Sequence, residues 1–500
     1  MNGEALRDEL ARAYGTPLPG VPLRWHELLD ESAVSLADRV APLLDDAPPA
    51  PPPPSPPADP APWPRLPVAT RDDAAALHAV TAWATAQGAV LDGVEIRIAA
   101  DGNRSVHARE ALVRNQRVMV VPRALMLVDD DLAATPLGLR LAPARERLAS
   151  PHTPFATWLA TERGRAGSPW RPYLDVLPAA PDVPTFRPDA ELAGLADTAA
   201  RAGIMAARRI LHADHAVVRE VVGADAPGLA EHAWAHALTN SRMFKLRIEG
   251  TDRRAMVPVA DFFDHGPGDT TWAYDDAAGG LVITAARRVA AGEELRLGYG
   301  QFSNAHLVAH YGFAVDDNRD DVALLLFPPA PTPLVDVAAA CLWDHRLRAP
   351  VELEVGARVE AGFRRALSLA RLRAASYRDL LQATDRGRFD NRELLWLGPA
   401  VEAAALALVA DAARAGLARL GPGPTGDEPD PWARTQARVR AGERAVLEAI
   451  LELPARAAPY LADPSPHAWY RAAVSIDILA SGGLGLVRHY ILNIADELPR

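Results

Sequence analysis

The stretch Met256-Val-Pro-Val-Ala-Asp-Phe-Phe-Asp-His265 joins an apolar, β-branched run to a turn that carries two carboxylates and an imidazole. Its first residues predict a strand over 256–259, and Asp261 is of a residue type that caps turns. A second segment, Gly292-Glu-Glu-Leu-Arg-Leu-Gly-Tyr-Gly300, indicates a strand over 294–297 entered through a turn at Gly292. Tyr299 therefore stands at the end of that strand.

Outward from these segments, the apolar spacing indicates a chain of mixed helices and strands. Beyond about residue 330 the spacing is helical almost throughout, as it is over most of 150–240 apart from a proline-rich interruption at 169–188. The order of strands, helices, strands and a final helical block predicts an α+β catalytic unit with an all-α partner. The other expected elements are strands at 93–99, 117–121 and 280–284, helices at 72–86 and 436–453, and a break at 421–431.

Length, composition and charge limit the classes of protein. A chain of 500 residues is too long for one ordinary core and predicts two or three domains. No apolar run reaches the roughly 18–20 residues that span a bilayer, and residues 1–14 lack the basic flank and apolar core of a secretory signal. We therefore expect a cytoplasmic protein without a membrane partner. The net charge of −11 argues against a nucleic-acid-binding surface.

Cysteine, lysine and histidine usage adds three expectations. Cys341 is the only cysteine, so an intramolecular disulfide and a thiolate zinc cluster are both excluded. Lys245 is the only lysine, and together with abundant alanine and 45 prolines this bias is typical of a GC-rich, bacterial genome. His212 and His215 have no evident third ligand, so we interpret them as a surface feature and predict no metal site.

Six motifs in one order resemble the SET-domain protein methyltransferases. Residues 256–265 resemble the family's Val-Pro-x-Ala-Asp-x-x-Asn-His segment. The pairing of 292–300 with Ser303-Asn-Ala305 and His310-Tyr-Gly-Phe313 resembles the Rubisco large-subunit lysine methyltransferase-like branch, which also includes an actin histidine methyltransferase. The likeness runs from about residue 70 to about 455. Further matches are Ser168-Pro-Trp-Arg-Pro-Tyr173, Ser241-Arg-Met-Phe244, Val106-His-Ala-Arg-Glu-Ala-Leu112 and the helical stretch 436–453.

This resemblance implies an α+β fold in which a SET domain of small, pseudoknotted sheets is split by a helical insert and followed by an all-α domain. The proline-dense run at 47–64 indicates a semi-rigid linker between an N-terminal helical extension and the SET domain. The predicted segments are an N-terminal helical extension (1–46), a proline-rich linker (47–66), the first SET part (67–135), the helical insert (136–240), the second SET part (241–328) and a helical substrate-binding-like domain (329–500).

The resemblance also implies an S-adenosyl-L-methionine-dependent protein N-methyltransferase that acts on a lysine, or less commonly a histidine, of a protein substrate. Tyr299 matches the family's catalytic tyrosine. The oligomeric state is left open. The matching positions imply cofactor binding by Gly102, Arg242, Asp264, His265 and Phe313, and substrate binding by Asp261, Tyr274 and Tyr311.

Two departures from the family pattern keep other functions open. The first cofactor loop retains only Gly102 of the usual Gly-x-Gly, and Asp264 replaces the usual asparagine. A catalytically inactive SET-like protein-binding module is therefore one alternative, and a methyltransferase acting on a peptide or small-molecule natural product is another. Three of the predicted site residues also fit a purely structural role. Tyr274 fits a packing residue, Asp261 fits a turn cap, and Arg242 fits a member of an ion pair.

Overall fold

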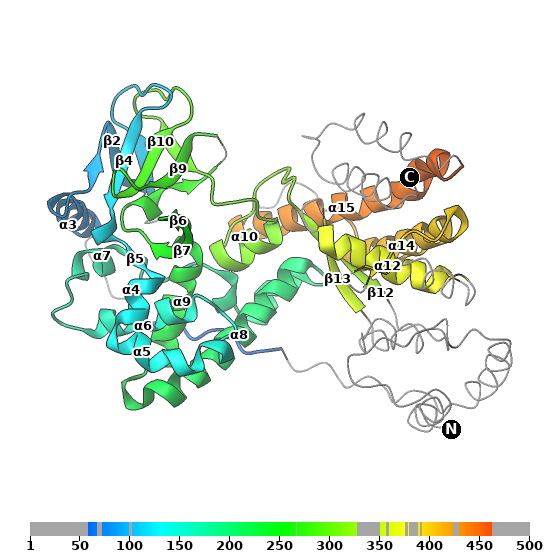
Figure 1. The fold of residues 1–500 in the computed structure, drawn as a ribbon, viewed down its shortest axis with the longest axis horizontal. Coiled ribbons are helices and arrows are strands. Elements are labelled where there is room, and N and C mark those ends of the chain that lie inside the picture. Colours follow the sequence, from blue (N-terminus) through cyan, green and yellow to red (C-terminus); the bar gives the residue numbers. More distant parts are fainter. Residues whose placement is uncertain are drawn as a thin grey trace.

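The structure is a computed structural model that describes residues 59–67, 73–99, 103–266, 268–327, 351–356, 360–375, 379, 389–390, 393–423 and 430–462. Small sheets gather at one end of the molecule, a helical insert lies beside them, and a second helical block forms the other end (Figure 1). The N-terminal extension, most of the proline-rich linker and Cys341 lie outside the described residues. Among the described helices, none combines the length and apolar character that crossing a membrane requires.

Two four-stranded sheets form the end of the molecule that carries the site. The first has the antiparallel order β1-β4-β10-β9, and the second has the order β2-β3-β11-β8 with β8 and β11 parallel. Their inward residues share one core with helix α3, as the alternating apolar pattern predicts. The bounds are α3 Asp73–Ala86, β1 Val90–Leu91, β2 Val94–Ile98, β3 Arg104–Ala108, β4 Arg117–Pro122, β8 Asp264–His265, β9 Thr270–Asp275, β10 Gly280–Ala285 and β11 Glu294–Leu297.

The helical insert follows these first strands and returns the chain to a three-stranded sheet, β5-β7-β6. Helix α8 begins where Thr198 accepts a hydrogen bond from the backbone of Arg201 and ends at Gly223, whose φ of 67° suits a residue without a side chain. The expected proline-rich interruption contains a short helix, α7. The bounds are β5 Leu127–Val128, α4 Asp129–Ala134, α5 Pro136–Leu141, α6 Thr153–Gly164, α7 Arg171–Val176, α8 Ala199–Val222, α9 Leu229–Arg242, β6 Met243–Ile248 and β7 Thr251–Met256.

The strand expected over 256–259 is wrong. Strand β7 lies earlier in the sequence and ends at Met256, which pairs with Met243 of β6 and with Leu127 of β5. The next residues form a turn and a single 3₁₀ turn over Ala260–Phe262. The apolar run predicts a strand here. A buried tight turn, however, has the same apolar composition as a buried strand.

The helical block near the C-terminus packs on its own core and is joined to the rest by α15. Within it, Arg371 makes a buried, bidentate ion pair with Glu402, in which Nε and Nη2 donate to the two carboxylate oxygens at 2.7 and 3.2 Å. Glu443 of α15 accepts a hydrogen bond from the backbone of Ala199 at the start of α8, at 2.7 Å. The break expected at 421–431 separates α14 from α15. The bounds are α10 Asn304–Tyr311, β12 Val322–Phe327, β13 Val351–Gly356, α12 Glu360–Ala374, α14 Pro399–Leu420 and α15 Pro431–Ala462.

Candidate active site

The Asp-His segment turns sharply at Val259. This residue has φ 65° and ψ −33°, a conformation that β-branched residues rarely adopt. Such backbone strain costs about 1–3 kcal/mol and persists only where the surroundings enforce it. The buried side chain of Val259 and the Phe262 N–H, which donates to the Val259 carbonyl at 3.4 Å, hold the turn in place. The turn points Asp261 inward and begins β8 at Asp264.

His265 and Tyr299 come together because β8 and β11 pair in parallel. The register aligns Asp264 with Arg296 and His265 with Leu297, so Tyr299 follows two residues beyond the pair. The Tyr299 backbone N–H donates to Nδ1 of His265 at 3.3 Å, and the two ring centroids lie 5.1 Å apart. The structure thus brings the Asp-His turn and the Tyr-Gly strand end together.

The Tyr299 hydroxyl is buried, and a hydrogen bond fixes its direction. It donates a hydrogen bond to the backbone carbonyl of Phe263 at 2.7 Å. Burial raises the pKa of the Tyr299 phenol well above its ordinary value, and burial also raises the pKa of Tyr311 to about 12. Both phenols are therefore neutral at physiological pH, so Tyr299 can orient a ligand by its dipole without acting as a strong base.

Five rings form an aromatic cluster that includes the ring of Tyr299. Tyr311 stacks on Tyr299 with centroids 5.1 Å apart and planes at 29°. The ring centroid of Phe313 lies 5.8 Å from that of His265 and 6.1 Å from that of Tyr311. The ring centroid of Phe302 lies 6.2 Å from that of Tyr311. These contacts unite four of the predicted site residues, Tyr299, Tyr311, His265 and Phe313, with Phe302, which the sequence did not single out.

Gly312 sets the directions of the two rings on either side of it. It ends α10 with φ 85°, in the left-handed region that favours glycine. A Cβ at this position would lie 2.1 Å from the carbonyl oxygen of Asp182. Tyr311 and Phe313 thus reach the same cluster from opposite sides of a bend that another residue type could not form.

Arg242 and Asp261, predicted to bind cofactor and substrate respectively, contact each other. Nη1 of Arg242 donates to the Asp261 backbone carbonyl at 2.8 Å and to its carboxylate at 3.2 Å. The hydroxyl of Tyr173 donates to the same carboxylate at 2.7 Å. The Asp261 side chain is 0% exposed and that of Arg242 14%, so the pair is buried rather than a surface ion pair. Tyr173 was quoted within a sequence motif but was assigned no role.

This buried pair keeps two polar atoms without a partner. Among the described residues, neither Nε of Arg242 nor Oδ1 of Asp261 has a hydrogen-bond partner. Buried polar groups are almost always satisfied, so an unpaired donor and an unpaired acceptor in one place are candidates for hydrogen bonds to a ligand that carries both kinds of group. The amino and carboxyl groups of an amino-acid moiety have this character.

Asp264 contacts Asn103, the residue that follows Gly102 in the sequence. Gly102 itself falls outside the described residues, but the next residue, Asn103, donates from Nδ2 to the Asp264 carboxylate at 3.0 Å. Burial, with Glu294 nearby, raises the pKa of Asp264 to about 6. A protonated Asp264 can donate one hydrogen bond, and in this form it resembles the asparagine that the family carries here.

The raised pKa of Asp264 predicts a pH-dependent gain in stability for Asp264→Asn. Because the folded state holds this proton more tightly than the unfolded state, the contribution of Asp264 is fully present below about pH 4 and is lost as pH rises through about 6. After discounting for partial exposure, we expect the variant to be more stable than the parent by about 1 kcal/mol near pH 8. Thermal melts of the parent and the variant near pH 4 and near pH 8 measure this difference. An equal gain in stability at the two pH values would contradict the prediction.

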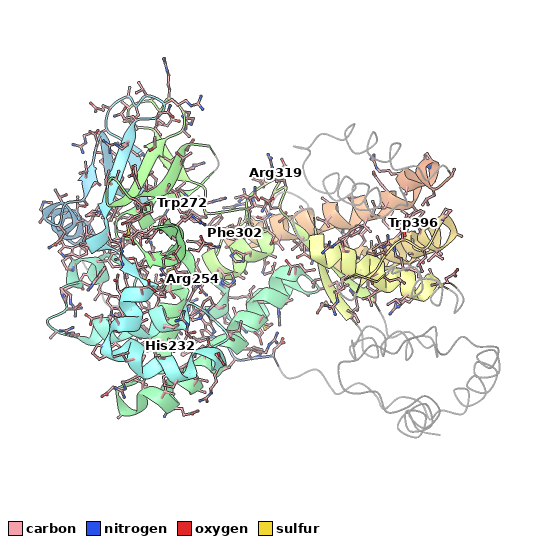
Figure 2. All side chains as sticks on the ribbon, viewed as in Figure 1. His232, Arg254, Trp272, Phe302, Arg319 and Trp396 are labelled. Atoms are coloured by element: carbon pink, nitrogen blue, oxygen red, sulfur yellow. The ribbon has the colours of Figure 1, made fainter. Side chains whose placement is uncertain are left out.

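Tyr274, predicted to line the substrate channel, does not join the aromatic cluster. It lies on β9 where its charged neighbours are Arg123, Asp276 and Glu249, and among the described residues no ring contact links it to the cluster. Trp272, two residues earlier, takes the position nearer the site. Its indole N–H donates to the carbonyl of Gly298 at 3.2 Å, and its ring centroid lies 5.3 Å from that of Phe244. Figure 2 labels Trp272 at the sheet end of the molecule.

The surface interpretation is wrong for His215, whereas His212 is half-buried. His215 and Asp214 are buried on α8. The Asp214 carboxylate accepts hydrogen bonds from the backbone of Ala149 at 2.8 Å and from the hydroxyl of Thr153 at 2.5 Å. The contacts of Asp214 therefore tie α8 to the start of α6. No metal-binding cluster of histidine, cysteine or carboxylate groups occurs among the residues that the structure describes.

Sequence comparison relates the chain to actin-histidine N-methyltransferases. The zebrafish enzyme is 25% identical over 252 residues, which cover 48% of this chain and 42% of that protein. The Drosophila melanogaster enzyme is 27% identical over 276 residues, covering 49% and 50%, and the human enzyme is 25% identical over 251 residues, covering 48% and 42%. The chain thus spans about half the length of these relatives or less. No family model matches it.

Structural comparison relates the chain to the SET domain of Rubisco LSMT. The structure of that domain bound to lysine and AdoHcy superposes with a TM-score of 0.62 at 21% identity, covering 78% of this chain and 92% of the other. The structure of Rubisco LSMT bound to AdoMet gives a TM-score of 0.60 at 20% identity, covering 77% and 93%. At this identity the likeness establishes the fold.

The chain therefore has a SET-domain fold of the α+β class, split by a helical insert and followed by a helical region, as the sequence predicted. The predicted resemblance to the Rubisco lysine methyltransferase-like branch is also confirmed, because the sequence relatives are actin-histidine N-methyltransferases and the structural relatives are Rubisco LSMT. The six segment boundaries stay a prediction.

Proposed function

We propose that the chain is an S-adenosylmethionine-dependent protein N-methyltransferase whose acceptor is a lysine side chain. The observation that carries this proposal is the meeting of the Asp-His turn with Tyr299. His265 accepts from the Tyr299 backbone, Phe263 accepts from the Tyr299 hydroxyl, and the ring of Tyr311 stacks on that of Tyr299. Support comes from the relatives, which are named as protein methyltransferases and, in structures, hold AdoMet or AdoHcy.

The residues present fit the cofactor. The unpaired Nε of Arg242 and Oδ1 of Asp261 suit the charged end of the methionine moiety, since a guanidinium binds a carboxylate well. We infer that Asp264 and the ring pair of His265 and Phe313, whose centroids lie 5.8 Å apart, would contact the rest of the cofactor. When bound, S-adenosylmethionine supplies an electrophilic methyl group on a positively charged sulfur.

The chain's own residues would prepare the acceptor by excluding water and fixing its direction. A lysine amine has an ordinary pKa near 10.4 and must lose its proton before it can attack. Walls of apolar and neutral aromatic rings disfavour the ammonium form by desolvation. The Tyr299 oxygen, anchored on the Phe263 carbonyl, would orient the amine, and alignment of this kind supplies several kcal/mol of barrier lowering.

A histidine acceptor is the second candidate. The sequence relatives are named for histidine methylation, and an imidazole with an ordinary pKa near 6.5 is already mostly neutral at pH 7. A neutral acceptor would need no help from desolvation. Paired peptides that differ only in a central lysine or histidine distinguish the two, since the preferred acceptor takes up more label from S-adenosylmethionine.

We expect S-adenosylmethionine to stabilise the protein. A ligand that binds only the folded state at about 100 times its dissociation constant adds about 2.7 kcal/mol to the free energy of unfolding. A thermal melt with and without the cofactor measures this gain. No shift at saturating cofactor would favour the inactive SET-like binding module instead.

Methyl transfer is then tested with radiolabelled S-adenosylmethionine and an array of lysine- and histidine-containing peptides. Lys245 is the only lysine, it is 71% exposed on β6, and it forms an ion pair with Asp252 at 3.2 Å. A Lys245→Arg variant therefore removes every lysine from the enzyme. Label that remains on this variant itself reports a different nucleophile, and label on natural-product peptides alone would favour the third alternative.

A further inference from the structure

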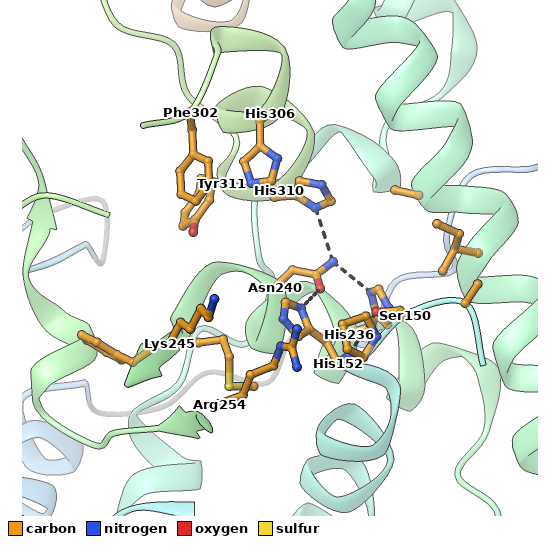
Figure 3. A pocket seen from close by; sticks show the side chains of 16 residues that line it. Ser150, His152, His236, Asn240, Lys245, Arg254, Phe302, His306, His310 and Tyr311 are labelled. Atoms are coloured by element: carbon orange, nitrogen blue, oxygen red, sulfur yellow. Dashed lines mark hydrogen bonds between the residues drawn. The ribbon is translucent and has the colours of Figure 1, made fainter. Parts of the chain in front are cut away.

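A basic pocket opens beside the aromatic cluster, between residues 149–152 just before α6, helices α8, α9 and α10, and the β6-β7 pair (Figure 3). Its volume is about 330 Å³. Tyr311 belongs both to its wall and to the stack with Tyr299, so the pocket continues from the proposed acceptor site. The polar and aromatic residues of its lining are Ser150, His152, His236, Asn240, Phe244, Lys245, Arg254, Phe302, His306, His310 and Tyr311.

The charge of this pocket is opposite to that of the chain. The protein carries a net charge of −11, yet the lining contains Lys245 and Arg254 and no aspartate or glutamate. At the outer rim, Lys245 shares the exposed Asp252 with Arg247, at 3.2 and 3.7 Å. The local excess of positive charge would attract an anionic group.

Arg254 is the focus of this charge. Its backbone N–H donates to Asp129 at 3.3 Å, but among the described residues its guanidinium has no hydrogen bond or ion pair. The adjacent Arg253 behaves differently, because its guanidinium contacts Asp130 at 2.6 Å. Successive residues of a strand face opposite sides, so Arg253 meets an acidic helix while Arg254 faces the pocket. A guanidinium binds a carboxylate through two parallel hydrogen bonds.

The inner wall is polar but uncharged. Nδ1 of His152 contacts Oδ1 of Asn240 at 2.7 Å, and the Asn240 amide donates toward Nδ1 of His236 at 3.1 Å and of His310 at 3.4 Å (Figure 3). Burial lowers the pKa of His152 and of His236, and lowers that of His310 to about 3. These rings are neutral at physiological pH, so Lys245 and Arg254 supply the pocket's charge.

We propose that this pocket binds an aspartate or glutamate side chain of the protein substrate, close in sequence to the methylated residue. The inference rests on the proposed function, since the acceptor must occupy the aromatic cluster for its neighbour to reach the pocket. Arg254 would hold the carboxylate, Lys245 would add charge at the rim, and Tyr311 would separate the two subsites.

The test uses fluorescent peptides with a central lysine, in which one glutamate is moved through the flanking positions, each paired with a glutamine control. Binding to the full-length protein is followed by anisotropy at low salt. At one position we expect glutamate to bind about tenfold more tightly than glutamine, as a charge-assisted pair would. Arg254→Gln should abolish this preference, and the matched variant Arg253→Gln should keep it.

A second measurement locates the bound peptide. Because Lys245 is the only lysine, labelling with [¹⁵N]lysine gives a single amide signal at the pocket rim. The acidic peptide should shift this signal in the parent protein and in Arg253→Gln, but not in Arg254→Gln. Equal affinity for glutamate and glutamine at every position, an unmoved signal, or no binding at all would overturn the proposal.

The two proposals fail in distinguishable ways. Glutamate-selective binding that depends on Arg254, without methyl transfer to any lysine or histidine peptide, would support the acidic-residue subsite and reject the enzymatic function. Methyl transfer that is indifferent to flanking glutamate, and unchanged in Arg254→Gln, would support the enzyme and reject the subsite. Melting curves with S-adenosylmethionine confirm that each variant is folded.

Discussion

Replacing Tyr299 with phenylalanine will lower methyl transfer about 100-fold without preventing S-adenosylmethionine binding. The hydroxyl lies at the junction of the Asp-His turn and the ring of Tyr311, where its oxygen can align an acceptor. Loss of alignment by about 1 Å is enough for a 10²-fold decrease in rate. The ring itself remains, so the cluster stays packed. Radiolabel transfer under single-turnover conditions measures the chemical step directly.

Tyr274→Phe provides a matched control for this prediction. It makes the same substitution at a tyrosine that the sequence also placed in the channel, but that lies on β9 outside the aromatic cluster. We expect its transfer rate to stay close to that of the parent. Undiminished transfer by Tyr299→Phe, or equal losses in the two variants, would remove the special role assigned to Tyr299.

Replacing Arg242 with methionine will destabilise the fold by about 3–5 kcal/mol, because it leaves a buried charge without its partner. The Asp261 side chain is 0% exposed, and its remaining hydrogen bond from Tyr173 cannot replace a cation. Burial already raises the pKa of Asp261 above its ordinary value, and without Arg242 the carboxyl group would be protonated more readily. Urea denaturation at neutral pH measures the loss.

Two further variants show whether the buried charge is the cause. Adding Asp261→Asn to Arg242→Met removes the unpaired carboxylate and should recover part of the lost stability. Arg147→Met breaks the exposed pair with Glu220, whose side chains are 50% and 59% exposed, and should leave the urea midpoint almost unchanged. If the double variant were less stable than Arg242→Met, the explanation from uncompensated charge would be wrong.

The fold was predictable where a local pattern is repeated along one element. Strands β2, β10 and β11 and helix α3 lie within a residue or two of their expected positions, since alternation and helical spacing reflect burial of one face. The prediction failed over 256–259, where strand β7 already ends at Met256 and the chain turns at Val259 with φ 65°. That conformation is imposed by packing, and a buried valine in a turn looks like a buried valine in a sheet.

By itself the sequence determined the order of the motifs, the SET-domain fold they encode, and the identity of the residues at the Asp-His turn and the Tyr-Gly strand end. Only the tertiary structure decided which groups became partners. Arg242 and Tyr173 both contact Asp261, although Tyr173 is separated from Asp261 by 88 positions, and the basic pocket joins side chains from residue 149 to residue 311. Local patterns record which face of an element is buried, whereas a charge acquires its partner only when folding brings distant segments together.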